Sequence, residues 1–90
     1  MLSSVIKASE KLKQMRETVS KDLENIPRFG IDQNLFRQMY SAVRMNSLGR
    51  KARIVDSKTE VLKECIKYYK KTNPGFKPRF NEKYFGVKMQ

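Results

Sequence analysis

Three stretches of this chain carry apolar residues at three- and four-residue spacing, and prolines and glycines separate them. That spacing gathers apolar side chains on one side of an α-helix. Pro27 and Pro74 disfavour helix at the residues before them, and Gly30 and Gly75 permit turns. The pattern therefore predicts an all-α chain, with an N-terminal amphipathic helix in residues 1–26, a helical hairpin in residues 27–73 and a tail in residues 74–90.

The first stretch predicts a helix over residues 3–26 with a narrow apolar stripe. The stripe has the spacing of a coiled-coil seam, and Asp22 interrupts it at one position; its members are Val5, Ala8, Leu12, Met15, Val19 and Ile26. Such a helix has too little apolar surface to stand alone, so we expect it to pack against another helix. Two alternatives stay open: a retained targeting-like arm, or a helix lying on a membrane surface. The acidic residues of the stretch disfavour the membrane surface, because they would face anionic lipid.

Two further helices share one apolar pattern. The second begins near Asp32, a favoured cap residue, and stops at Gly49. The third begins at Ser57, which with Glu60 has the form of a capping box. Their apolar residues have the same spacing, namely Leu35, Phe36, Met39, Tyr40 and Val43 in one and Val61, Leu62, Cys65, Ile66 and Tyr69 in the other. Matched faces joined by a short loop predict an antiparallel hairpin.

The tail, residues 74–90, is not helical by pattern and is predicted to be extended. Its aromatic residues alternate with Lys77, Arg79 and Lys83, and they are Phe76, Phe80, Tyr84 and Phe85. Two interpretations stay open. Aromatic rings between cations can stack on nucleic-acid bases, or they can fill the apolar grooves of a protein partner with the cations at the rim. We favour the second interpretation and take the four aromatic residues as candidate partner-binding residues.

The chain has a formal net charge of +11, and the charge is uneven. Residues 27–54 hold six basic residues and one acidic residue. Arg50, Lys51 and Arg53 form the densest cationic stretch, which is either a solvated loop or a docking site for phosphate or acidic side chains. Such a chain favours an acidic neighbour: nucleic acid, anionic lipid or an acidic protein surface.

Composition argues against catalysis and against a metal site. The chain has no histidine and one cysteine, so a zinc site and a His-activated nucleophile are disfavoured. Cys65 lies within an apolar stripe, where a small core residue is expected. The glycines are dispersed and form no phosphate-cradling loop. We therefore expect a protein that is not an enzyme and needs no cofactor.

Two features bear on where the protein works. No apolar run approaches the roughly 20 residues of a membrane-spanning helix. The opening "MLSSVIKAS" has serines, a lysine and no acidic residue, a composition similar to the start of a mitochondrial targeting segment.

Residues 31–85 resemble coupling factor six of mitochondrial ATP synthase, a small helical subunit of the peripheral stalk. "DQNLFRQMYSAVR" is similar to the first helix of that family, "RIVDSKTEVLKE" to the start of its second helix, and "FKPRFNEKYFGV" to its aromatic C-terminal segment. The "LFR" of Leu35–Arg37 also resembles the Leu-Tyr-Arg motif of mitochondrial assembly and accessory proteins.

The resemblance implies a structural accessory subunit on the matrix side of the mitochondrial inner membrane, packed against long helical subunits of a multi-protein assembly. A small basic RNA-binding protein of the mitochondrial ribosome is the rival hypothesis, because of the net charge and the interleaved aromatic residues. An accessory subunit of a respiratory complex is a third hypothesis.

Overall fold

The computed structural model describes residues 2–50 and 58–88, with residues 2–8 described by their backbone alone. These parts of the chain form four helices, α1 (Leu2–Glu24), α2 (Gly30–Gly49), α3 (Lys58–Thr72) and the short α4 (Glu82–Phe85). They contain no strand, which confirms the all-α prediction for the described residues. None of their helices is both long and apolar enough to cross a membrane.

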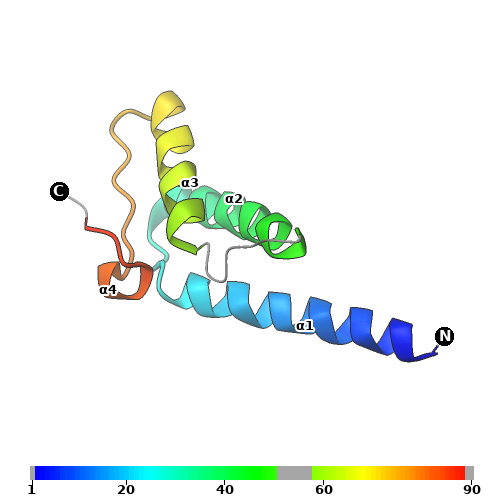
Figure 1. The fold of residues 1–90 in the computed structure, drawn as a ribbon. Helices are drawn as coiled ribbons and strands as arrows, with labels where there is room; N and C mark the ends of the chain where they lie inside the picture. The colour runs from blue at the N-terminus through cyan, green and yellow to red at the C-terminus, as the bar shows by residue number, and fades with distance from the viewer. Residues whose placement is uncertain (1, 51–57, 89–90) are drawn as a thin grey trace.

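Helix α1 stands out from the rest of the molecule. Its N-terminal half projects beyond the other helices, while its C-terminal half packs against α2 (Figure 1). The molecule accordingly measures 51 × 26 × 22 Å along its principal axes. The predicted apolar stripe follows this division, since Val19 is buried whereas Leu12 is 40% exposed.

Helix α2 begins earlier than the sequence predicts. Phe29 occupies the N-cap position without a side-chain hydrogen bond, so Asp32 lies in the first turn and is not the cap. A carboxylate in the first turn is favourable, because the helix dipole is positive there. Gly30 adopts a φ of 72°, a left-handed conformation that glycine takes at little cost. The predicted stop at Gly49 is confirmed.

Helix α3 packs on α2 through aromatic and aliphatic side chains. The rings of Phe36 and Tyr69 meet edge to face, with their centroids 5.9 Å apart, and the Tyr69 hydroxyl donates a hydrogen bond to the carbonyl of Asp32 at 3.3 Å. The end of α3 therefore contacts the start of α2. Figure 1 shows α3 crossing α2 and not lying along its length. The capping-box residue Ser57 lies outside the described residues.

The apolar face predicted for α2 is divided between the core and the surface. Phe36 and Tyr40 are completely buried, whereas Leu35 is 48% exposed and Val43 is 40% exposed. The buried side of α2 also includes two polar residues, Gln33 and Arg44. Of the apolar residues predicted to share one face of α2, Phe36 and Tyr40 therefore belong to the core, whereas Leu35 and Val43 lie at the surface.

The tail folds back onto the helices. It leaves the end of α3, passes the end of α1 and forms α4 (Figure 1). The backbone N–H of Asn81 donates to the backbone carbonyl of Asn25 at 2.8 Å. The Asn81 side chain accepts from the backbone N–H of Tyr84. Gly86 ends α4 with a φ of 67°, the left-handed conformation common at helix C-termini. Part of the tail predicted to be extended is thus a capped helical turn.

One hydrophobic core joins α2, α3, the end of α1 and the tail. Its buried members are Ile26, Phe36, Tyr40, Val61, Leu62, Cys65, Ile66, Phe76 and Phe85. The prediction that Cys65 is a core residue is confirmed, because its side chain is 3% exposed. Burial, together with the nearby negative charge of Glu64, raises the pKa of the Cys65 thiol to about 11.

We expect Cys65 to react slowly with alkylating reagents. The ordinary value is 9.0, so a thiol of pKa about 11 has about one hundredth of the usual thiolate at pH 8, and the thiolate is the nucleophile. The folded chain binds the proton of the Cys65 thiol more tightly than the unfolded chain does. The contribution of this proton to the free energy of unfolding is therefore fully present below pH 9 and is lost as the pH rises toward 11. Iodoacetamide labelling followed by mass spectrometry would measure the rate. Labelling in the folded state as fast as in denaturant would contradict the buried placement.

Candidate functional site

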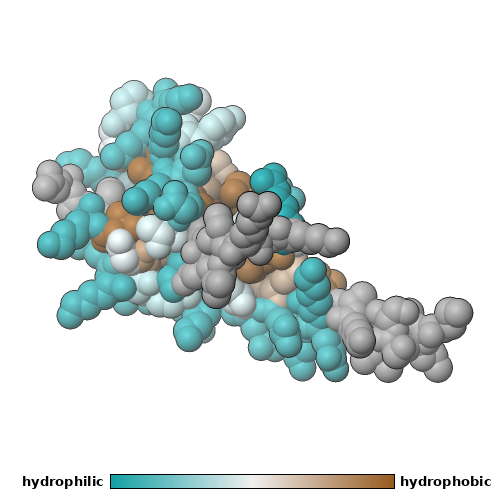
Figure 2. Space-filling view, in the orientation of Figure 1, coloured by the Kyte–Doolittle hydropathy of each residue, from teal (hydrophilic) through white to brown (hydrophobic). Residues whose placement is uncertain are grey.

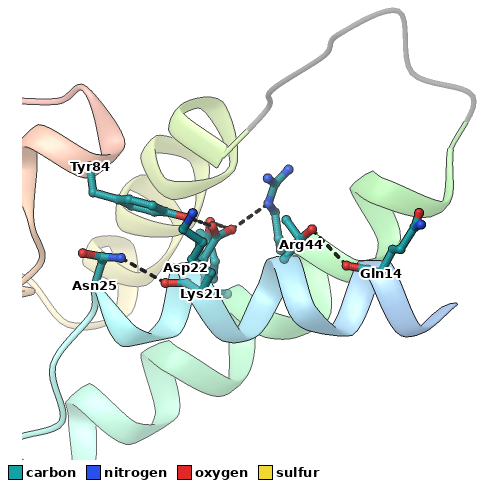
Figure 3. A network of polar contacts seen from close by, with 8 residues as sticks. Gln14, Lys21, Asp22, Asn25, Arg44 and Tyr84 are labelled. Atoms are coloured by element: carbon teal, nitrogen blue, oxygen red, sulfur yellow. Dashed lines mark hydrogen bonds and ion pairs between the residues drawn. The ribbon is translucent and has the colours of Figure 1, made fainter. Parts of the chain in front are cut away.

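The carboxylate of Asp22, near the end of α1, is a charged group buried inside the molecule. Its side chain is completely inaccessible to solvent, and Oδ2 accepts hydrogen bonds from the Tyr40 hydroxyl at 2.7 Å and from Arg44 Nε at 2.8 Å. Its other oxygen, Oδ1, accepts a hydrogen bond from the Tyr84 hydroxyl. Figure 3 shows Tyr84 and Arg44 reaching Asp22 from opposite sides. The carboxylate thus connects α1, α2 and α4.

The electrostatics of this cluster are those of a satisfied ion pair. Arg44 is 3% exposed, and its positive charge compensates that of Asp22 within the core. Burial, and then the hydrogen bond to Asp22, raise the pKa of the Tyr40 hydroxyl far above its ordinary value. Tyr40 therefore remains a neutral donor throughout the neutral range. Because three donors occupy the carboxylate and no solvent reaches it, the cluster fixes helices relative to one another.

The predicted partner-binding residues of the tail lie largely within the chain's own core. Phe85 is completely buried and Phe76 is 8% exposed, while Phe80 and Tyr84 are partly buried against the same core. The Phe85 ring makes edge-to-face contacts with those of Tyr40, Phe80 and Tyr84. Phe76 and Phe85 therefore cannot fill a partner's groove in this conformation, and this correction follows from the tail folding back onto α2 and α3. A cation–aromatic contact from Lys58 covers the Tyr84 ring.

The predicted cationic docking site is described in part. Arg50 is exposed at the C-terminal cap of α2, and its backbone N–H donates to the carbonyl of Ser47 at 3.3 Å. Lys51 and Arg53 lie outside the described residues. Their role in binding an acidic surface stays a prediction.

An apolar surface that the sequence did not single out runs along the outer side of α2. Leu35, Met39 and Val43 follow one another at four-residue intervals, and Tyr68 of α3 is 66% exposed beside Met39 and Val43. Met39, Val43, Tyr68 and Cys65 border a hollow of about 310 Å³, with Glu64 at its edge. We call Leu35, Met39, Val43 and Tyr68 the outer apolar strip. Figure 2 shows hydrophobic surface over α2 framed by hydrophilic side chains.

The buried Asp22 cluster and the outer apolar strip were both missed in the sequence. Asp22 was visible as the charged interruption of an apolar stripe, and this was a signal of a buried carboxylate with partners. The strip could not be recognised, because its residues have the same spacing as the neighbouring core residues.

Comparison with models of protein families, with curated protein sequences and with solved structures gives no match to this chain. The function is therefore argued from its residues, their arrangement and the resemblance described above.

We expect the change Asp22→Asn to destabilise the fold strongly. The variant keeps the shape of the side chain but leaves the buried Arg44 guanidinium without its counter-charge, a loss of about 3 kcal/mol or more in the free energy of unfolding. Urea unfolding followed by circular dichroism would measure it. Glu17→Gln, at an exposed position of the same helix, is the control and should have little effect. Equal stability of the two variants would show that the ion pair is not important for the fold.

Proposed function

We propose that this protein is a non-catalytic accessory subunit that binds helices of a larger assembly in the mitochondrial inner membrane, with the peripheral stalk of ATP synthase as the leading assignment. The observation that carries the proposal is the outer apolar strip. Leu35, Val43 and Tyr68 lie outside the hydrophobic core and are 40% or more exposed, while Met39 packs partly against the core, and the four side chains come from two packed helices. An exposed apolar surface rimmed by polar residues is typical of a protein interaction site.

The geometry of the strip suits a helical partner. Its α2 residues repeat every four positions, and Tyr68 of α3 forms the other wall of the hollow beside Met39 and Val43. A groove between two helices accepts the apolar side of a third helix, with side chains spaced by three and four residues. The half-exposed Leu12 on the projecting part of α1 offers a second apolar contact to a long partner helix.

The charge of the chain indicates the character of the partner. The exposed side chains of α3 near its C-terminal end include Lys67, Lys70 and Lys71. Acidic residues beside the apolar stripe of a partner helix would complement them, and repulsion between two chains of charge +11 disfavours pairing with a second copy. In the proposed mechanism the partner helices cover the apolar strip, and their acidic side chains pair with the exposed lysines of α3.

The resemblance to coupling factor six supports the assignment to the stalk. The similar segments include "DQNLFRQMYSAVR", which provides the α2 part of the strip, and "FKPRFNEKYFGV", which forms the folded tail. In the stalk the protein would stiffen long helices that resist the torque of the rotor. The hairpin of this proposal consists of α2 and α3, which pack together with the end of α3 in contact with the start of α2.

RNA binding is the competing function, and the net charge of +11 favours it. The buried positions of Phe76 and Phe85 weigh against the stacking platform on which that hypothesis depended. Ribosome binding would therefore depend mainly on phosphate contacts, with a steep dependence on salt concentration.

We expect the double change Leu35→Gln and Val43→Gln to reduce incorporation into the assembly without unfolding the chain. Both positions are exposed by 40% or more, and glutamine is compatible with a helix, so the thermal melt should change little. Native gels of mitochondrial membranes, with the tagged chain detected by blotting, would measure incorporation. Lys63→Gln, at an exposed position of α3 that is not one of the three lysines named above, is the control for altered surface composition.

Three results would contradict the proposal. The tagged wild-type chain could migrate alone and never with a membrane complex, or the Leu35 and Val43 variant could be incorporated as well as the wild type. Sedimentation with ribosomes, reversed by ribonuclease, would favour the RNA hypothesis instead.

A further inference from the structure

A second hollow lies on a different side of α2, where the end of α1 meets its middle. It has a volume of about 540 Å³ and is lined by Leu23 of α1, Arg28 of the connection and several residues of α2. That volume lies within the range of about 300–1,000 Å³ typical of small-molecule sites. The hollow is distinct from the outer apolar strip, with which it shares no residue.

Two arginines provide the charge of this hollow. Arg37 is partly buried, and its Nη1 donates a hydrogen bond of 2.6 Å to the carbonyl of Leu23, which fixes the guanidinium at the end of α1. Burial, and then the positive charge of Arg28, lower the pKa of Arg37, which indicates that the two cations are close. No acidic side chain lines the hollow, and neither arginine has a carboxylate partner among the described residues. A bound anion would relieve their repulsion.

Neutral hydrogen-bonding groups line the same hollow. Asn34, Gln38 and Ser41 follow one another on α2 at intervals of four and three residues, and Arg37 lies between the first two. Residues at these intervals share one side of a helix. Apolar surface from Leu23, Ala42 and Met45 completes the lining.

We propose that Arg28 and Arg37, with Asn34, Gln38 and Ser41, bind a phosphate monoester group whose attached carbon chain lies against the apolar lining. Two guanidinium groups match the charge of about −1.5 to −2 that a phosphate monoester carries near pH 7. The amide and hydroxyl groups supply further donors for a group with three terminal oxygens. A carboxylate has fewer oxygens and half the charge, so it would leave part of this donor set without an acceptor.

A purely structural explanation accounts for only one of the two arginines. The hydrogen bond from Arg37 to Leu23 satisfies a carbonyl at the C-terminal end of α1, where a cation is favourable. Arg28 is exposed and makes no intramolecular hydrogen bond in the described part of the chain, so folding does not explain its position beside a like charge.

The test is a titration of the full chain with phenyl phosphate, followed by the amide signals of ¹⁵N-labelled protein. We expect saturable shifts at Asn34, Gln38 and Ser41, and affinity at least about tenfold lower in Arg28→Gln and in Arg37→Gln, because each removes a charge-assisted contact. Arg16→Gln, which removes an exposed arginine of α1, is the matched control and should bind as the wild type does. If Arg37→Gln unfolds, Arg28→Gln still decides the result, because Arg28 makes no hydrogen bond that the fold requires.

The source of the phosphate is separated by a second titration, with vesicles containing phosphatidic acid. Tighter binding to these vesicles than to phenyl phosphate would assign the phosphate to a lipid headgroup, provided that Arg28→Gln weakens the binding and Arg16→Gln does not. Tighter binding to phenyl phosphate than to the vesicles would assign it to a soluble metabolite. Shifts that do not saturate, an equal loss in Arg16→Gln, or equal affinity for the dicarboxylate succinate would each overturn the proposal.

Discussion

The fold depends on one buried carboxylate. Asp22 occupies a position in the apolar stripe of α1 where an apolar residue would be expected, and its charge has to be compensated inside the molecule. Arg44 supplies the counter-charge from α2, while the hydroxyls of Tyr40 and Tyr84 supply the remaining donors. Because these partners come from α2 and α4, the requirements of a single side chain place α1, α2 and the tail relative to one another.

The second constraint is that the aromatic tail folds back onto the helices and packs in their core. A chain of 90 residues with three substantial helices has a small core, and Phe76 and Phe85 add two large side chains to it. The backbone bond from Asn81 to Asn25 and the hydrogen bond from the Thr59 hydroxyl to the Phe85 carbonyl hold the tail to α1 and α3. The tail therefore makes the chain more self-sufficient than its composition indicates. Among the described residues, the outer apolar strip and the arginine-lined hollow are two candidate surfaces for partners.

These two surfaces differ in what they can recognise. The strip presents apolar side chains from two packed helices and suits the apolar side of another helix. The hollow presents cations and neutral donors and suits a small anion. The strip and the hollow both include residues of α2. One side of this helix therefore packs in the core, and two other sides form the strip and the hollow. Under the two proposals above, one helix would contact both a protein scaffold and a phosphate compound.

The sequence by itself determined the three long helices and where they end, because local chemistry sets those ends. The boundaries near Glu24, Gly49 and Thr72 follow from proline, glycine and the period of the apolar residues. The burial of Cys65 was also predictable, since it lies in the middle of the narrow stripe of α3. Only the tertiary structure decided which apolar residues face inward. Leu35 and Phe36 are adjacent and similar in character, yet the direction from which α1 and α3 approach α2 buries one and exposes the other. The partners of Asp22 and the convergence of Arg28 with Arg37 were equally beyond sequence reasoning, because those contacts join residues whose distance in space is set by helix packing and not by their spacing along the chain.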